Sequence, residues 1–292
     1  MVAHVAQLTD CHVQPPGERS DVGIDSNAAL ARAVARLDEL APRPDAVVLT
    51  GDLTDHGTPE EFGELLRLLE PIDVPVLPVA GNHDERVGLA AAFADFEGTG
   101  PEPFWQWVVD VGPVRLVALD TTIDGRHDGE LDATRLRWLD EALLDEPDRP
   151  TIVCMHHPPF ETGIWWMDAG ALRVGGGELR ELVGGHPQVR RIICGHHHRS
   201  IVTGWGSTTV SVAPSTSHQV HFDLEPESPA RFTEEPAGFH VHRCLDDGDV
   251  ITHVVPVASP EGVVDLGGVF GGWDRFRDAL RSGRPMRKSS SA

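Results

Sequence analysis

The sequence predicts an α/β fold of four layers (α-β-β-α), in which two β-sheets pack face to face and helices cover the outer side of each sheet. Short segments rich in Val, Ile and Leu alternate with segments of helical periodicity as far as Gly195, which is typical of layered α/β folds. After Gly195, strand-like segments separated by turns predominate, so the second half is expected to add the second sheet. Of the 292 residues, 40% are hydrophobic and 24% charged, as in ordinary globular proteins.

Ten segments are expected to be strands, because they are short, apolar and bounded by turn residues. The segments up to Gly195 are Ala3–Leu8, Ala46–Thr50, Val76–Val79, Val114–Leu119, Thr151–Met155 and Arg191–Cys194. The segments after it are Ile201–Gly204, Thr208–Val212, Phe239–Leu245 and Val250–Val257. Asp247 and Gly248, which separate the last two, fit a hairpin turn.

Helices are expected where apolar residues recur at helical spacing. Ser26 is the expected cap of the first helix, and Thr58-Pro59-Glu60-Glu61 forms a capping box with Pro at the first helical position of the second. The apolar faces of these two helices are Leu30, Val34, Leu37 and Leu40, and Phe62, Leu65, Leu66 and Leu69. A third helix carries Leu136, Leu139 and Leu143.

One domain is expected over residues 1–272, because no repeat of fixed period and no linker divides that range. Residues 273–292 are expected to form a C-terminal helix and tail. The end of this tail, from Ser282 to Ala292, is basic and Ser-rich, so partial disorder is predicted there.

The charge balance excludes some partners. With 24 basic and 46 acidic residues, the net charge of −22 repels nucleic-acid backbones and anionic lipid, so neither nucleic acid nor a membrane is an expected partner. The N-terminus lacks the basic start and apolar stretch of a signal peptide, and no apolar run approaches the ~20 residues of a membrane span. The four widely spaced cysteines are expected to be buried thiols, so a cytoplasmic location is predicted.

Clusters of metal-binding residue types follow five of the predicted strands. They are Asp10-Cys11-His12, Gly51-Asp52-Leu53-Thr54-Asp55, Gly81-Asn82-His83-Asp84, Met155-His156-His157-Pro158 and Gly195-His196-His197-His198. Each cluster alone is weak evidence, but the strand ends of an α/β sheet share one edge, so the five predict one site. Asp, Asn and His favour Mn, Fe, Co or Zn over a thiolate-bound metal. We expect Asp10 and His12 to point the same way because they are two residues apart on an extended segment.

The order of these motifs, DxH, GDxxD, GNHD, HHP and GHxH, resembles that of the calcineurin-like metallophosphoesterases over roughly Val2 to Ser217. The resemblance implies the four-layer sandwich of that family and two adjacent metal ions, which are Fe, Mn, Zn or Co. It implies Asp10, His12, Asp52 and His198 as ligands of the first ion, and Asp52, Asn82, His156 and His196 as ligands of the second. Asp55, which closes the GDxxD motif, is expected to hydrogen-bond to a ligand instead of binding metal.

Softer patterns point to one branch of that family. They are Leu119-Asp120-Thr121-Thr122, Gly129-Glu130-Leu131 at the start of the next helix, His156-His157-Pro158-Pro159 and Ser217-His218-Gln219. They resemble the bacterial class III cyclic-nucleotide phosphodiesterases, which are related to glycerophosphodiesterases. The resemblance implies hydrolysis of a small phosphodiester, 3′,5′-cyclic AMP above all, through attack by a hydroxide that bridges the metals. A glycerophosphodiesterase or a broad phosphoesterase is the alternative, and a metal-free binding scaffold is disfavoured because every ligand is present.

Other residues are assigned roles around this centre. His83 is the expected catalytic group, which steadies the phosphoryl group or protonates the departing alkoxide. Asp84 is expected to orient the His83 ring, and Asn82 also contacts substrate. His157 and His197 alternate with ligands and are expected to point away.

The remaining candidates concern the pocket around the centre. His218 is expected near the pocket. Trp165 and Trp166 are expected to stack on a base, the alternatives being a packing loop or a homodimer contact. Cys11 is expected to pack behind the site.

Overall fold

The computed structural model describes residues 2–20, 23–96, 100, 102–233, 235–259 and 262–283. The chain divides into two compact units, Met1–Ala258 and Ser259–Ala292, so the boundary expected after residue 272 lies inside the second unit. That second unit contains α7 (Leu266–Val269) and α8 (Trp273–Ser282). The tail predicted to be partly disordered begins at Ser282, which is the last residue of α8, and residues 284–292 lie outside the described residues.

The first sheet of the larger unit has the strand order β15-β14-β1-β2-β3. Its strands are β1 (Ala3–Leu8), β2 (Ala46–Thr50), β3 (Val76–Val79), β14 (Gly238–Cys244) and β15 (Val250–Pro256). The first three are parallel to one another, whereas β14 pairs antiparallel with both β1 and β15. The carboxyl ends of β1, β2 and β3 therefore lie at one edge of this sheet.

The second sheet has the strand order β10-β11-β9-β7-β5-β4. Its strands are β4 (Trp107–Val111), β5 (Val114–Leu119), β7 (Thr151–Met155), β9 (Val189–Cys194), β10 (Ile201–Trp205) and β11 (Thr208–Val212). Here β5, β7, β9 and β11 are parallel, and the outer strands β4 and β10 are antiparallel to their neighbours. Two small sheets pair β6 (Gly129–Glu130) with β8 (Leu172–Val174), and β12 (Gln219–Val220) with β13 (Phe232–Thr233).

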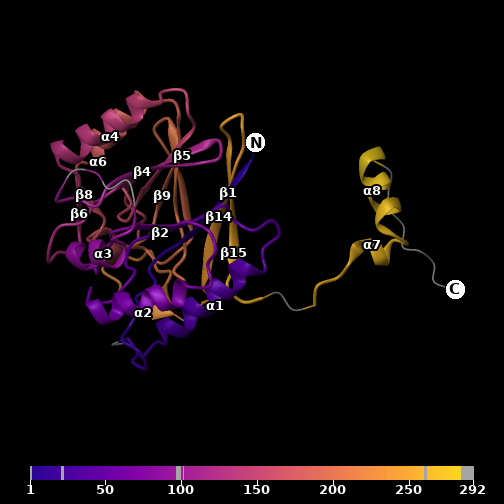
Figure 1. Ribbon diagram of the computed structural model, residues 1–292, viewed down its shortest axis with the longest axis horizontal. Coiled ribbons are helices and arrows are strands. Elements are labelled where there is room, and N and C mark those ends of the chain that lie inside the picture. Colours follow the sequence, from indigo (N-terminus) through magenta and orange to yellow (C-terminus); the bar gives the residue numbers. More distant parts are fainter. Residues whose placement is uncertain are drawn as a thin grey trace. The chain divides into compact units, whose positions relative to one another are not determined.

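Helices cover the outer faces of the two large sheets, which confirms the predicted four layers. The helices of the larger unit are α1 (Ser26–Asp38), α2 (Pro59–Leu69), α3 (Arg86–Ala92), α4 (Ala133–Asp145), α5 (Trp165–Asp168) and α6 (Gly176–Gly184). Figure 1 shows α1 and α2 on the opposite side of this unit from α4 and α6. Within the described residues, no helix is long and apolar enough to span a bilayer.

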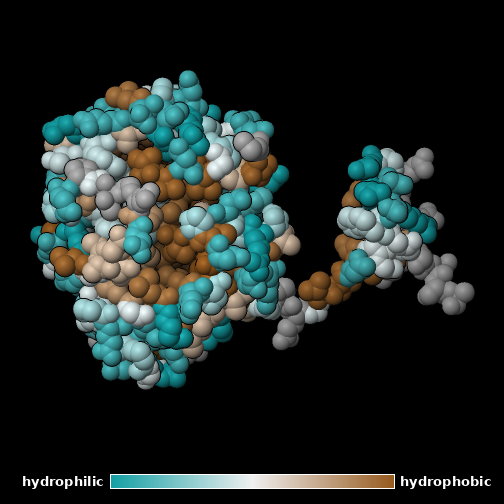
Figure 2. Space-filling view, viewed as in Figure 1, coloured by the Kyte–Doolittle hydropathy of each residue, from teal (hydrophilic) through white to brown (hydrophobic). Residues whose placement is uncertain are grey.

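Alternate residues of the second sheet enter different parts of the core. Ile152 and Cys154 pack with β1 and β2, whereas Val153 and Met155 pack with α4 and α6. Both faces of the sheet are therefore buried, which explains why its strands are almost wholly apolar. Figure 2 shows hydrophobic residues down the middle of the visible face of this unit, with hydrophilic residues around them.

The sequence predicted one helix start correctly and two incorrectly. The capping box of α2 is present as predicted, with Thr58 and Glu61 bonding reciprocally. The cap of α1 is Asp25, whose side chain accepts from Ala28 N, so Ser26 is the first helical residue and not the cap. Gly129 and Glu130 form the strand β6, and α4 begins only after its cap Asp132, which corrects the expected helix start at Gly129.

The strands after Gly195 do not form a sheet of their own, which corrects that expectation. β10 and β11 extend the sheet of β9, whereas β14 and β15 extend the sheet of β1. The physical reason is that β1 pairs with β2 along one edge only. Its other edge would be left open, and β14 satisfies the backbone N–H and C=O groups there. Hydrophobic pattern identifies a strand but not its neighbours.

Candidate metal centre and active site

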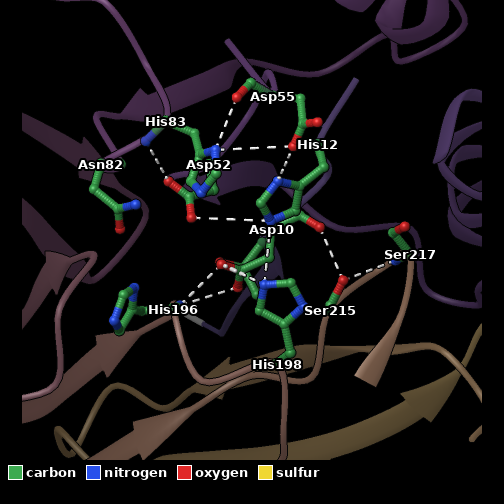
Figure 3. Close-up of polar contacts among 12 residues, drawn as sticks. Asp10, His12, Asp52, Asp55, Asn82, His83, His196, His198, Ser215 and Ser217 are labelled. Carbon is green, nitrogen blue, oxygen red and sulfur yellow. Dashed lines mark hydrogen bonds and ion pairs between the residues drawn. The ribbon is translucent and has the colours of Figure 1, made fainter. Parts of the chain in front are cut away.

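The seven predicted metal ligands come together at the carboxyl ends of five strands. Each lies one to four residues after the end of β1, β2, β3, β7 or β9. Asp10, His12 and Asp52 come from the first sheet, and His196 and His198 come from the second (Figure 3). The site is therefore built where the same edges of both sheets meet.

The backbone at this edge is turned into an unusual conformation. Among the described residues, six that are not glycine have φ in the left-handed region, and five of the six are predicted ligands. Those five are Asp10 (50°), His12 (47°), Asp52 (50°), His196 (71°) and His198 (48°). Left-handed φ is costly for such residues and concentrates at functional sites. The side chains of Asp10 and His12 thus converge through two left-handed turns and not through the extended segment that the sequence suggested.

Glycine is required where these turns approach each other. A Cβ on Gly51, whose φ is +91°, would overlap the ring of His156. A Cβ on Gly195 would overlap the Thr9 hydroxyl and crowd the Asp10 carboxylate. The glycines of the GDxxD and GHxH motifs therefore permit the close packing of the strand ends.

The first predicted group, Asp10, His12, Asp52 and His198, brings nitrogen and oxygen atoms close together. The Nε2 atoms of His12 and His198 are 3.2 Å apart, and His198 Nε2 is 3.4 Å from Asp10 Oδ1. Asp52 Oδ2 lies 3.9 Å from His12 Nε2. A metal ion would satisfy all of these lone pairs together.

The second predicted group, Asp52, Asn82, His156 and His196, surrounds one ring nitrogen. His156 Nε2 is 3.1 Å from Asn82 Oδ1, 3.3 Å from Asp52 Oδ2 and 3.3 Å from His196 Nδ1. A single N–H cannot satisfy three acceptors at once, so these four atoms fit a shared cation better than they fit one another. Asp52 belongs to both groups and is placed to bridge them.

Outer hydrogen bonds orient the histidine rings. His12 Nδ1 is 2.8 Å from Asp55 Oδ1, His156 Nδ1 is 2.8 Å from Thr50 O, and His198 Nδ1 is 2.9 Å from His218 O. If each Nδ1 donates, the unprotonated Nε2 faces the centre, which is the arrangement a metal ligand needs. Asp55 has the role predicted for it, and its other oxygen accepts from Gln14 Nε2 at 2.5 Å.

The electrostatics of the site also fit cation binding. Burial alone would raise the pKa of Asp52, but His156, His83 and His12 hold that pKa well below its ordinary value. Burial would likewise raise the pKa of Asp10, and His198 and His156 lower it. Burial lowers the pKa of His196 well below its ordinary range, so this ring is neutral. Burial would lower the pKa of His156, but the Asp52 and Asp10 carboxylates raise it to about 9. Two ionised carboxylates together with these imidazoles form a donor set suited to Mn, Fe, Co or Zn.

His83 lies beside this centre, but Asp84 does not orient its ring as expected. The ring Nδ1 of His83 is 2.8 Å from the backbone oxygen of Asp55. Burial would lower the pKa of His83, yet the Asp52 carboxylate and the Asp55 carbonyl raise it.

The carboxylate of Asp84 instead ties two loops together. It accepts from the backbone N–H groups of Gly81 (2.9 Å), Leu53 (3.1 Å) and Thr54 (3.0 Å), and from the Thr54 hydroxyl (2.9 Å). Burial, and secondarily the charge of Asp52, raises the pKa of Asp84 to about 6. Asp84 thus joins the loop that carries Asp52 to the loop that carries Asn82.

A cleft of about 900 Å³ opens over the two groups. Trp166 and His218 line it, as predicted, whereas Trp165 does not. The indole N–H of Trp165 donates to Ser228 O at 2.8 Å, which holds the ring outside the cleft, unlike its expected place against substrate. The rings of Trp166 and Phe232 meet edge to face at 5.9 Å, and Phe232 also packs on His218.

Two residues of the cleft escaped the sequence analysis. Phe232 lies in the short strand β13, outside every motif. His127 lines the cleft between His83, whose ring centroid is 5.7 Å away, and Asn82, whose Nδ2 is 3.3 Å from His127 Nδ1. Neither residue follows a predicted strand, so no local signal identifies it.

Two residues were expected to point away from the metals, but a ring nitrogen of His157 lies within 4.8 Å of those of His156 and His196. His157 contacts the Thr121 hydroxyl (2.8 Å) and His127 O (3.1 Å), and burial lowers its pKa to about 3. His197 contacts Asp168. Cys11 is fully buried, and burial raises the pKa of its thiol to about 12, which makes it unreactive as a thiolate. All four cysteines are buried and free, as predicted.

Comparisons with known proteins agree with this geometry. The family model described as calcineurin-like phosphoesterase matches residues 3–200. A glycerophosphodiester phosphodiesterase of Enterobacter lignolyticus is 33% identical over 82% of this chain and 86% of its own length. The 3′,5′-cyclic adenosine monophosphate phosphodiesterase of Pseudomonas aeruginosa is 30% identical over 86% of this chain and 88% of its own. The crystal structure of a dimetal phosphatase from Danio rerio superposes with a TM-score of 0.64 at 15% identity, covering 88% of this chain and 97% of that one.

Proposed function

The chain belongs to the calcineurin-like metallophosphoesterase family and is a metal-dependent phosphodiester hydrolase, and from this premise we propose that its preferred substrates are 3′,5′-cyclic nucleotides, cyclic AMP first. The observation that carries the proposal is the aromatic wall of Trp166 and Phe232, which stands in the same cleft as the two ligand groups. A flat base can pack against that wall while its phosphate reaches the centre. The buried, free cysteines favour action in the cytoplasm.

The residues present would hold two metal ions. Asp10, His12, Asp52 and His198 would hold one, and Asp52, Asn82, His156 and His196 the other, with Asp52 shared. When bound, the two ions supply Lewis-acid stabilisation of phosphoryl charge and a nucleophile at neutral pH. The two ionised carboxylates keep the site anionic, and the left-handed turns fix the donors before substrate arrives.

His83 is the proposed general acid. Its Nδ1 is engaged by the backbone oxygen of Asp55, so Nε2 is the nitrogen that can exchange a proton in the cleft. The raised pKa of His83 means that a larger fraction of the ring carries the proton near neutral pH. That proton can go to the oxygen that leaves phosphorus, which in a cyclic nucleotide stays attached to the ribose. Asn82 and His127, 3.3 Å apart, offer further polar contacts to the phosphate.

Glycerophosphodiesters are the rival substrates, because the Enterobacter lignolyticus relative acts on that class by name. Their glycerol and small headgroups need no aromatic surface. The two classes therefore differ in how much the wall of Trp166 and Phe232 contributes.

The deciding experiment compares kcat/KM for 3′,5′-cyclic AMP, glycerophosphoethanolamine and bis-p-nitrophenyl phosphate, with wild-type protein and the variants Trp166→Ala and Phe232→Ala. We expect cyclic AMP to be the best natural substrate and each variant to raise its KM by about tenfold, within the range for base stacking. Trp165→Ala is the matched control and should leave KM unchanged. A higher kcat/KM for glycerophosphoethanolamine than for cyclic AMP would refute the proposal.

A further inference from the structure

A buried carboxylate shapes the segment that carries Trp166. Asp168 Oδ1 accepts from the backbone N–H and the hydroxyl of Thr162, both at 2.8 Å, and Oδ2 accepts from Gly163 N at 2.8 Å. Burial would raise the pKa of Asp168, but its hydrogen bonds with His197 and Thr162 lower it to about 2, so the group is ionised at neutral pH. Asp168 therefore closes the segment from Thr162 to Asp168 into a rigid loop around the single turn of α5.

The same carboxylate connects this loop to the second sheet. His197 Nε2 is 3.3 Å from Asp168 Oδ1, and the ring of His197 is fully buried. Its neighbours in sequence, His196 and His198, are predicted metal ligands on either side of it. Among the described residues no polar atom contacts His197 Nδ1, so Asp168 is the one polar group that orients this ring.

A second contact lies two residues further along. Gly170 passes so close to the ring of His196 that a Cβ added there would lie 3.0 Å from Nε2. Met167, Ala169 and Gly170 line the cleft together with Trp166. The segment that carries Trp166 therefore contacts the loop of His196 and His197 at two neighbouring points, through Asp168 and through Gly170.

We propose that the Asp168–His197 contact is a positioning device for substrate specificity. It sets the place of Trp166 and Met167 relative to the metal ligands, and so decides how tightly a phosphodiester with a flat, apolar group binds. A small phosphodiester, which does not reach this wall, is bound and hydrolysed without it. The inference rests on the proposed phosphodiesterase function. Its test is the ratio of affinities for two diesters, whereas the proposed function is decided by which natural substrate has the highest kcat/KM.

The test uses Asp168→Ala, with Asp168→Asn as the conservative variant because an amide oxygen still accepts from Thr162 and His197. We expect Asp168→Ala to raise KM for 3′,5′-cyclic AMP by about tenfold, the effect expected from a displaced stacking surface. KM and kcat for methyl 4-nitrophenyl phosphate should change by less than about twofold, with metal content unchanged. Asp168→Asn should recover most of the loss. Calorimetric binding of a hydrolysis-resistant cyclic phosphorothioate should weaken by the same factor as KM.

The matched control is Asp140→Ala, which breaks another Asp–His contact, 2.7 Å from Asp140 Oδ1 to His186 Nε2, away from the cleft. This variant should lower the stability of the protein without changing the ratio of KM values for the two diesters. The double variant Asp168→Ala with Trp166→Ala should bind cyclic AMP no more weakly than Trp166→Ala alone, because both changes remove the same interaction.

Equal effects of Asp168→Ala on both diesters, or loss of metal from this variant, would overturn the inference and leave the contact merely structural. Failure of the proposed function has a different signature, since wild-type protein would then hydrolyse neither diester or prefer glycerophosphodiesters. If the wild-type protein prefers glycerophosphodiesters, the inference is still tested by the ratio of its affinities for the cyclic phosphorothioate and the small diester.

Discussion

Replacing Asp84 by Ala separates two roles for this residue. The structure predicts that Asp84 joins the Asp52 loop to the Asn82 loop through four accepted hydrogen bonds. The alternative, favoured by the GNHD motif, is that Asp84 orients the His83 ring for catalysis. The first role predicts loss of stability and metal, and the second predicts a slower reaction in an otherwise intact protein.

The size of the effect follows from the groups involved. Asp84→Ala leaves the backbone N–H groups of Gly81, Leu53 and Thr54 without their acceptor, at about 1–3 kcal/mol each when they stay buried. Against this, removing the carboxylate relieves its desolvation. Its pKa of about 6, against 3.8 ordinarily, corresponds to about 3 kcal/mol at pH 8. With a central value of about 2 kcal/mol for each of the three N–H groups, or about 6 in all, the net loss is about 3 kcal/mol. This loss lowers Tm by roughly 6–12 °C in a unit of this size.

Thermal unfolding at pH 8 and metal analysis after dialysis measure this prediction. We expect the Tm loss above and a metal affinity lower by about 10–100-fold, the usual effect of removing a group that supports ligands. Asp84→Asn keeps the shape and most acceptors, and should lose less than half as much Tm. Unchanged Tm and metal content with a lower kcat would refute this reasoning and restore the catalytic role.

Three further predictions test the rest of the site and the core. Asp52→Ala should lower metal content well below the expected two ions per chain and abolish hydrolysis, as measured by metal analysis and with a chromogenic diester. Full activity in this variant or in metal-free protein would contradict the binuclear centre. His83→Ala should reduce kcat by about 10²–10⁴-fold on substrates with a poor leaving group while metal content stays unchanged, and an unaltered rate would remove it from the mechanism. Burial lowers the pKa of His240 to about 4, so below its ordinary value of 6.5 the unfolded chain takes up a proton that the folded chain excludes. Stability should therefore fall by up to about 3 kcal/mol from pH 6.5 to pH 4, and denaturant titrations of His240→Gln should show a shallower fall than wild type; parallel curves would exclude this group.

The sequence alone determined the layers and the inner part of the site. Strands such as Thr151–Met155 are apolar on both faces, and the capping box at Thr58 is a local signal, so both are readable without tertiary contacts. The metal-binding motifs were equally readable, because parallel strands bring their carboxyl ends to one edge whatever the detailed packing. The place of Asp55 at the end of the GDxxD motif also indicated its role, and its carboxylate is 2.8 Å from His12 Nδ1.

Tertiary structure decided everything that depends on neighbours distant in sequence. Hydrophobic pattern identifies Gly238–Cys244 as a strand, but only the open edge of β1 places it in the first sheet. Trp165 and Trp166 are equivalent in sequence, yet successive residues of a helix point about 100° apart, so one enters the cleft and the other binds Ser228. Phe232 reaches the cleft only because β13 pairs with β12. Backbone pairing and helix rotation are properties of the assembled chain, and they choose which side chains complete the site.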